Sequence, residues 1–186
     1  LLKISNLKSK IIEVSSEGID IFLRKIDNRY FFTETNQENL SFVLEITKKF
    51  KLNKNLIIKT VKNFKGLKYR QQIILNKKNL TIINDSKSTS FSSSVGILKV
   101  NNNIYWLLGG VYKKGDRFEL SKKYSKNIKA FIYGKKRKFF NKQLKNKIEY
   151  KNFHNLKDAL KKIFMIIKKK KFVHKTVLFS PSAASF

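Results

Sequence analysis

The feature that most limits the fold of this chain is an alternation of short apolar segments and helical segments after Gly66. Five segments have the length and the apolar, partly β-branched composition of strands. They cover residues 72–75, 80–83, 104–108, 128–133 and 176–179. Four segments with helical patterns lie between them, at residues 92–100, 120–125, 136–146 and 155–170. This alternation predicts an α/β fold with a mostly parallel sheet and helices on its faces.

The segment Tyr105–Leu108 is apolar at every position, which is typical of a central strand buried on both faces. In open α/β sheets, ligands bind outside the carboxyl ends of the strands. The loops that follow Ile83, Leu108 and Phe179 are therefore predicted to hold the functional residues.

The part of the chain before Gly66 has a different pattern. Short apolar runs at residues 11–14, 19–26 and 30–32 are separated by turn signals and predict a small set of strands. From residue 38 the apolar residues recur at helical spacing, first to residue 50 and again over 56–64. Two packed helices are expected there, with Gly66 as the C-terminal cap of the second.

The charge of the chain is strongly positive, because 42 Lys and Arg residues face only 12 Asp and Glu residues. A net charge of +30 suggests a nucleic-acid partner, and the runs 135–138 and 168–171, with Phe139 and Phe140 beside the first, are candidate contacts. However, only five of the 42 are Arg, which is the better phosphate ligand. We interpret the lysines as a solvated surface, with nucleic-acid binding as an alternative function.

Several function classes are excluded by residues that are missing. The chain has no Cys, so disulfides, thiolate zinc sites and a thiolate nucleophile are ruled out. His154 and His174 have no patterned acidic neighbours, and neither a P-loop nor a dinucleotide-binding glycine motif occurs. No apolar run approaches the ~20 residues of a membrane span, so a cytoplasmic protein is expected. Leu1 in place of Met, and an end directly after a patterned segment, suggest a piece of a longer protein.

The loop after the second apolar strand reads Asn84–Ser90 and carries two charged residues of opposite sign. Asp85 is suited to a sugar hydroxyl and Lys87 to an anionic substrate. Ser90 and Ser92 are also ordinary helix-capping residues, and this interpretation stays open for both.

Two further loops have unusual sequences. In Gly109–Asp116 the paired glycines let the backbone approach a ligand and Lys113 can reach a carboxylate or phosphate, although a solvated turn explains the same residues. The last loop, Ser180–Phe186, is rich in small residues, which also suit a tight turn. We expect Asp85, Lys87, Lys113 and Ser185 to meet at one edge of the sheet.

Taken in order, these loops resemble the Mur ligase family, and within it the members that add D-glutamate. The matching segments are Gly66–Arg70, Asn84–Thr89, Leu107–Gly110 with Lys113, and Leu178–Ser185, within a resemblance that covers residues 38–186. The resemblance implies an ATP-dependent ligase of peptidoglycan synthesis. It further implies that residues 1–65 are the C-terminal part of a central ATP-binding domain and residues 66–186 a Rossmann-like amino-acid-binding domain, truncated at its end.

The resemblance also implies the chemistry. ATP would phosphorylate the carboxylate of UDP-N-acetylmuramoyl-L-alanine, and the amine of D-glutamate would attack the acyl phosphate. The partners would be small molecules, the enzyme a monomer, and the cofactors ATP and Mg²⁺. The phosphate-binding loop and the magnesium ligands would precede Leu1, so this piece is not expected to catalyse alone.

Residue roles follow by matching positions. The resemblance implies that Asn39 contacts adenine, Arg70 the ATP phosphates and Asp85 the ribose. It implies that the D-glutamate site is lined by Lys87, Thr89, Lys113, Ser185 and the backbone of Phe186.

The chain departs from the family pattern at Glu38, Ser90, Val111 and Tyr112, where the family usually has His, Asn, an acidic residue and Gly. These departures concern substrate contacts. Another Mur ligase with a different amino-acid substrate is the nearest alternative, but a diamino acid would need an acidic partner for its distal amine, whereas Lys87 and Thr89 favour D-glutamate.

Overall fold

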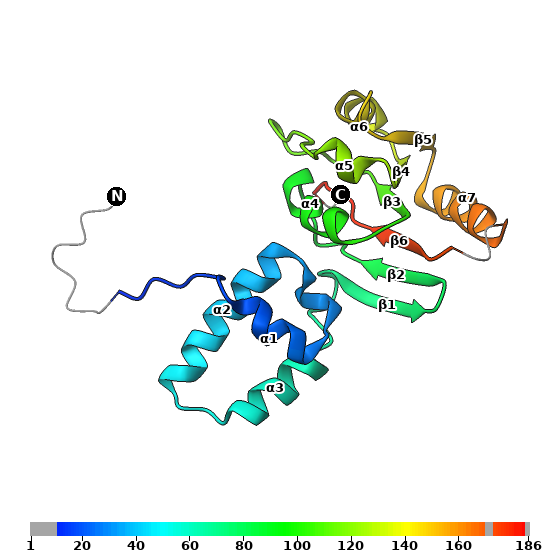
Figure 1. Ribbon diagram of the computed structural model, residues 1–186. Helices are drawn as coiled ribbons and strands as arrows, with labels where there is room; N and C mark the ends of the chain where they lie inside the picture. Colours follow the sequence, from blue (N-terminus) through cyan, green and yellow to red (C-terminus); the bar gives the residue numbers. More distant parts are fainter. Residues whose placement is uncertain (1–10, 170–172, 185–186) are drawn as a thin grey trace. The chain divides into compact units, whose positions relative to one another are not determined.

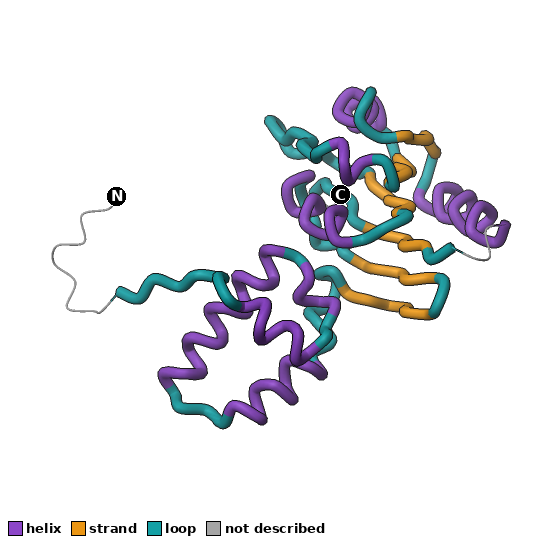
Figure 2. The backbone as a smooth tube through the Cα atoms, viewed as in Figure 1, coloured by secondary structure: helices purple, strands orange, loops and turns teal. Residues whose placement is uncertain are grey.

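The computed structural model describes residues 11–169 and 173–184 (Figure 1). The chain divides into two compact units, and the boundary falls between Asn63 and Phe64. The first unit is helical and the second contains all the strands found in the described residues (Figure 2).

Over residues 11–63, the first unit contains three α-helices and one 3₁₀ helix around a small apolar core. Its elements are α1 (Ile19–Ile26), η1 (Arg29–Phe32), α2 (Glu34–Lys49) and α3 (Lys54–Asn63). The core includes the buried side chains of Ile26, Phe31, Leu40 and Val61. The two helices predicted after residue 38 are thus confirmed as α2 and α3.

The strands predicted at residues 11–14, 19–26 and 30–32 are wrong. Residues 11–14 have no regular secondary structure, and the other two segments are α1 and η1. The β-branched and aromatic residues of α1 favour strands by propensity, but Ile19 and Ile26, seven positions apart, both face the core of the unit. The packing of this helical face outweighed the local propensity for strands.

The predicted cap at Gly66 is also wrong. Helix α3 ends at Asn63, and Gly66 lies three residues later in the connecting segment, with a φ of 77°. The side chain of Asn63 donates a hydrogen bond of 2.8 Å to the carbonyl oxygen of Lys59, which satisfies a carbonyl of the last turn without a glycine.

The second unit is built on a six-stranded sheet with the order β1-β2-β6-β3-β4-β5. The strands are β1 (Gln72–Lys77), β2 (Leu80–Asn84), β3 (Ile104–Leu108), β4 (Ile128–Tyr133), β5 (Glu149–Phe153) and β6 (Lys175–Phe179). Strand β1 is antiparallel to β2, and every other pair is parallel. The predicted α/β fold with a mostly parallel sheet is confirmed.

Helices cover both faces of this sheet. They are α4 (Phe91–Val100), α5 (Lys122–Ser125), α6 (Arg137–Leu144) and α7 (Leu156–Lys169). One apolar cluster joins α4 and α6 to the sheet through Phe91, Trp106 and Phe140, and the other joins α7 through Phe131 and Ile163. All five residues of β3 are buried, as predicted for a central strand.

Strand β5 was missed by the sequence pattern. It pairs only with β4, so it is an edge strand, and most of its residues are exposed or half-buried. Its sequence Glu-Tyr-Lys-Asn-Phe lacks the apolar run on which strand prediction depends.

Candidate functional site

The loops after β3 and β6 are joined by backbone hydrogen bonds at the carboxyl edge of the sheet. The amide of Ser180 donates to Leu107 at 3.2 Å and that of Gly109 to Pro181 at 3.1 Å. Further out, the amide of Ala184 donates to Val111 at 2.9 Å. The two loops therefore leave the sheet side by side, as expected for adjacent parallel strands.

The paired glycines are required by this close approach. Gly109 has a φ of 148° and Gly110 a φ of 139°, in the region that favours glycine. A Cβ on Gly109 would overlap the backbone of Tyr133, and one on Gly110 would lie 3.0 Å from the Cβ of Ala183. The glycines thus serve packing between loops within the protein.

The loop after β2 joins the same edge. The amide of Asp85 donates to Phe179 at 2.7 Å, and the amide of Lys87 donates to Tyr69 at 3.0 Å. All three loops singled out by the sequence therefore meet at one edge of the sheet, together with the segment around Tyr69.

Asp85 is the most perturbed charged group in this region. It is only 5% exposed, and its carboxylate accepts hydrogen bonds from the amide of Gln71 at 3.0 Å and the hydroxyl of Ser180 at 2.7 Å. Burial raises its pKa to about 6, against the opposing effects of Ser180, the Gln71 amide and the Arg70 guanidinium. Such a carboxylate in a loop cluster is typical of functional sites.

A chain of buried serine hydroxyls extends from Asp85. Ser180 contacts Ser94 at 2.7 Å, and Ser94 also contacts Ser182 at 2.6 Å and Ser88 at 2.7 Å. Ser94, Ser180 and Ser182 are completely buried. The sequence analysis did not single out Ser94 or Ser88, although the run of serines at the start of α4 was a usable signal.

The other predicted site residues lie as follows. Lys87 and Thr89 are exposed on the loop after β2, Lys113 is exposed on the loop after β3, and Arg70 is exposed beside β1. Ser185 and Phe186 lie outside the described residues. Asn39 is exposed on α2, in the first unit.

The capping interpretation is confirmed for Ser90 but not for Ser92. Ser90 is the N-cap of α4 and forms a reciprocal capping box with Ser93. A second carboxylate assists, because Asp116 accepts a hydrogen bond of 2.9 Å from the amide of Phe91. Asp116 therefore ties the loop after β3 to the start of α4, a role that its sequence position did not suggest.

The two aromatic residues proposed as a nucleic-acid stacking surface pack against other aromatic residues of the second unit. Phe140 is completely buried, and Phe139 stacks on Tyr112 with ring centroids 3.9 Å apart and an interplanar angle of 8°. His174 is half-buried, and its Nε2 lies 3.0 Å from the Thr81 hydroxyl.

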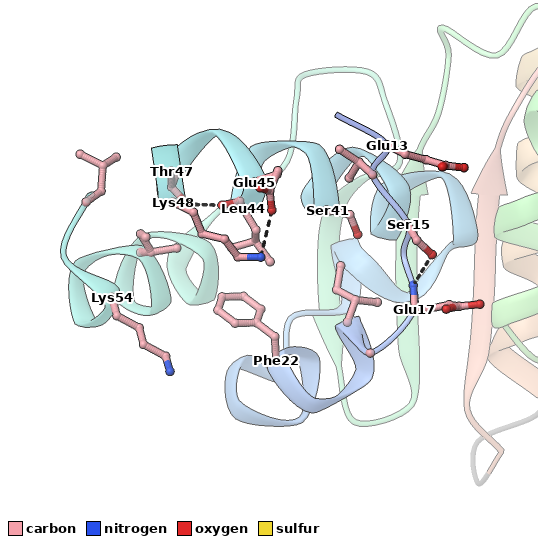
Figure 3. Close-up of a pocket in the computed structure, with 15 residues that line it drawn as sticks. Glu13, Ser15, Glu17, Phe22, Ser41, Leu44, Glu45, Thr47, Lys48 and Lys54 are labelled. Carbon is pink, nitrogen blue, oxygen red and sulfur yellow. Dashed lines mark hydrogen bonds and ion pairs between the residues drawn. The ribbon is translucent and has the colours of Figure 1, made fainter. Parts of the chain in front are cut away.

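The first unit contains a pocket of about 520 Å³ (Figure 3). Phe22, Leu44 and Ile57 give it an apolar lining, and the ion pair between Lys48 and Glu45, at 3.0 Å, lies on its wall. Asn39 does not line it. None of the predicted site residues is among the described residues that line this pocket.

Metal and membrane features were searched over residues 11–169 and 173–184. In these segments no three His, Asp or Glu side chains group closely enough to hold a metal ion. No helix in the same segments combines the length and apolar character needed to cross a bilayer.

Curated proteins of one name are similar to this chain, although no family model matches it. The UDP-N-acetylmuramoylalanine–D-glutamate ligase of Wolbachia sp. subsp. Brugia malayi is 35% identical over 153 residues, which is 82% of this chain and 30% of that protein. The enzyme of the same name from Francisella tularensis strain FSC 198 is 33% identical over 184 residues, 97% of this chain and 42% of that protein. The chain thus spans less than half the length of these relatives.

Solved structures show the same fold. MurF from Acinetobacter baumannii matches with a TM-score of 0.57 at 17% identity, over 81% of this chain and 35% of that protein. MurC from Thermotoga maritima matches with a TM-score of 0.56 at 16% identity, over 82% of this chain and 35% of that protein. Together, the relatives and the shared α/β fold show that this chain belongs to the Mur ligase family.

Proposed function

We propose that this chain is part of an ATP-dependent ligase that adds D-glutamate to UDP-N-acetylmuramoyl-L-alanine. The observation that carries the proposal is its 33% identity, over 184 residues, to a ligase named for D-glutamate. The meeting of the three motif-bearing loops at one sheet edge supports it, because Mur-like residues far apart in the sequence come together there. The substrates place the reaction in the cytoplasm and in cell-wall synthesis.

The reaction proceeds in two steps. A carboxylate oxygen of the UDP-linked substrate bonds to the γ-phosphorus of ATP and ADP leaves, which gives an acyl phosphate. The D-glutamate nitrogen then bonds to the acyl carbon while the C–O bond to phosphate breaks and the amine loses a proton. Activation is needed because phosphate is a far better leaving group than oxide, and the protein contributes by orienting the amine and excluding water.

The D-glutamate site is assigned to Lys87, Thr89, Lys113, Ser185 and the backbone of Phe186. Lys87 and Lys113 are exposed, on loops that meet at the sheet edge. An ammonium group forms a strong charge-assisted hydrogen bond to a carboxylate, and D-glutamate brings two carboxylates. The two lysines therefore suit the substrate while leaving its amine free to react.

The acidic residues near these loops favour D-glutamate over a diamino acid. Both carboxylate oxygens of Asp85 accept bonds from the protein, and Asp116 is bonded to the amide of Phe91. Each of these carboxylates is thus already engaged by the protein, which makes it a weaker partner for a distal amine. A Mur ligase for a diamino acid is therefore the weaker alternative.

The assigned ATP contacts fit ATP to different degrees. Arg70 is exposed and its guanidinium suits a phosphate. Asp85 is buried and doubly bonded, so only its remaining lone pairs are available to a ribose hydroxyl. Asn39 lies in the first unit. We assign residues 1–65, which include this unit, to the central ATP-binding domain and residues 66–186 to the amino-acid-binding domain. Mg²⁺ would neutralise ATP phosphate charge, and no described residue is assigned to hold it.

A chimeric enzyme tests the proposal. The segment of the Francisella tularensis ligase that aligns with this chain is replaced by this chain, and phosphate release is measured with each substrate omitted in turn. Release that requires ATP, the UDP-linked substrate and an amino acid supports the proposed class. A folded chimera that binds a random-sequence oligonucleotide, resists polyanion competitors and releases no phosphate would favour the nucleic-acid alternative.

A further inference from the structure

The hydroxyl of Ser94 lies between two of the loops at the sheet edge. It contacts Ser88 in the loop after β2 at 2.7 Å, and Ser180 and Ser182 in the loop after β6 at 2.7 and 2.6 Å. Ser94 is completely buried, so water cannot replace these contacts without a rearrangement. We propose that Ser94 is a positioning residue that holds the two loops together as one ligand-binding element.

The direction of each hydrogen bond follows from the ionised carboxylate at the end of the chain of hydroxyls. The hydroxyl of Ser180 donates to Asp85, so it can only accept from Ser94. The single hydrogen of Ser94 is thereby used, so Ser94 can only accept from Ser88 and Ser182. The hydroxyls of Ser88 and Ser182 also lie within reach of the Ser90 and Ser180 carbonyl oxygens, at 3.4 and 3.5 Å. One donated and two accepted bonds are the full capacity of a hydroxyl.

This saturation makes Ser94 difficult to replace. Removal of its oxygen leaves Ser180 without its donor and takes one acceptor from Ser88 and from Ser182, although Ser88 keeps its contact with the Ser93 hydroxyl at 2.7 Å. Buried polar groups that lose their partners carry a full desolvation penalty. Both loops would relieve that penalty by opening toward water, and they would do so together.

The backbone at Ser182 gives independent support. Ser182 has a φ of 53°, which is an uncommon conformation for a residue other than glycine, and it is completely buried. A strained conformation of this kind persists when its surroundings over-determine it. The bond from Ser182 to Ser94 fixes the turn that directs Ala184 onto Val111.

Ser94 thereby sets the positions of the groups that would meet the ligand. Lys87 and Thr89 flank Ser88 directly, and Ala184 lies two residues beyond Ser182. The identity of the ligand, D-glutamate, rests on the proposed function. The joining of the two loops does not, because it follows from the hydrogen bonds alone.

Amide hydrogen exchange on the full 186-residue chain tests the joining of the loops. Ser94→Ala is expected to accelerate exchange at the amides of both Lys87 and Ala184 by about tenfold, the effect of losing one buried hydrogen bond. The control is Ser92→Ala, the same change on the same helix at an exposed residue whose hydroxyl contacts Ser90. Acceleration at one loop only, or an equal effect in the control, would overturn the proposal.

A second variant covers the case in which Ser94→Ala unfolds. Ser182→Gly is compatible with the positive φ and removes the side chain whose hydroxyl contacts Ser94. It is expected to accelerate exchange at Ala184 while Lys87 stays protected, because the bond between Ser94 and Ser88 remains. No change at Ala184 would show that Ser94 does not hold this loop.

The ligand is tested in the chimeric enzyme. Ser94→Ala is expected to raise the KM for D-glutamate about tenfold. If the loops loosen together but the KM for D-glutamate is unchanged, Ser94 joins the loops without positioning the substrate, and the proposal fails. If the unmodified chimera shows no D-glutamate turnover, the proposed function fails, and the exchange experiment alone decides the role of Ser94.

Discussion

The hydroxyl of Ser180 donates a 2.7 Å hydrogen bond to the carboxylate of Asp85, across 95 positions of sequence. This bond joins the ends of two neighbouring parallel strands, β2 and β6. It also places a carboxylate with a raised pKa, near 6, among buried hydroxyls at the centre of the candidate site.

Asp85 makes stability depend on pH in an identifiable window. Its pKa is about 6 in the folded protein against an ordinary value of 3.8, so between these values the folded state binds more protons than the unfolded state. The free energy of unfolding should therefore fall as pH rises through this window, by on the order of 3 kcal/mol in total, with no further contribution outside it. Urea unfolding at pH values from about 4 to 7, compared with Asp85→Asn, isolates this slope. Parallel curves for the two proteins would contradict the raised pKa.

The close approach of the loop after β3 predicts unequal costs at two glycines. Gly109→Ala should destabilise the second unit by ~2–4 kcal/mol, because its Cβ would overlap the backbone of Tyr133. Gly115→Ala is the matched control, since Gly115 has a φ of 81° but nothing within 4 Å of a Cβ, and it should cost only ~1 kcal/mol. Equal midpoints of urea unfolding for the two variants would contradict the close packing of Gly109 against Tyr133.

Helix α2 has two apolar faces with different surroundings. Leu40 is 3% exposed and packs in the core of the first unit, whereas Ile46 is 57% exposed. Leu40→Ala should lower the free energy of unfolding by ~2–5 kcal/mol and Ile46→Ala by at most ~0.5 kcal/mol. Thermal unfolding at two protein concentrations checks this. A large, concentration-dependent cost at Ile46 would mean that a second copy covers this face.

Lys113 and Lys114 are adjacent exposed lysines with different expected roles. In the chimeric enzyme, Lys113→Ala should raise the KM for D-glutamate by tenfold to a hundredfold, the loss of a charge-assisted hydrogen bond of ~1.5–3 kcal/mol, while the KM for ATP is unchanged. Lys114→Ala should leave both KM values within about twofold. Steady-state kinetics measures both KM values, and the melting temperatures of the variants must match that of the unmodified chimera. An unchanged KM for D-glutamate in Lys113→Ala would mean that Lys113 is a solvated lysine and not a substrate contact.

The strands of the second unit could be predicted where burial leaves an apolar signature in the sequence. Tyr105–Leu108 is apolar throughout because β3 is covered on both faces, and its prediction was correct. Strand β5 could not be found in this way, since an edge strand buries too little surface to require apolar residues. In α1 the propensity of Ile and Phe for strands opposed the helical spacing, and only tertiary packing settled the outcome.

The candidate site could be predicted at the level of loops but not of contacts. Parallel topology alone brings the ends of β2, β3 and β6 to one edge, so the grouping of Asp85, Lys87 and Lys113 there followed from the strand pattern. The hydroxyl contacts of Ser94 depend on the rotation of α4 and on the φ of Ser182, and neither is encoded in a short motif. The matching of Ser185 and Phe186 to the D-glutamate site stays a prediction.

A competition experiment on the chimeric enzyme tests the central claim, that this chain belongs to a D-glutamate-adding ligase. The chimera is supplied with ATP, the UDP-linked substrate and an equimolar mixture of D-glutamate, L-glutamate and a diamino acid, and the products are separated and identified by mass and by chiral analysis of their hydrolysates. The account predicts that the D-glutamate adduct dominates, with formation abolished when ATP is omitted. A product that carries the diamino acid, or equal incorporation of both glutamate enantiomers, would contradict it.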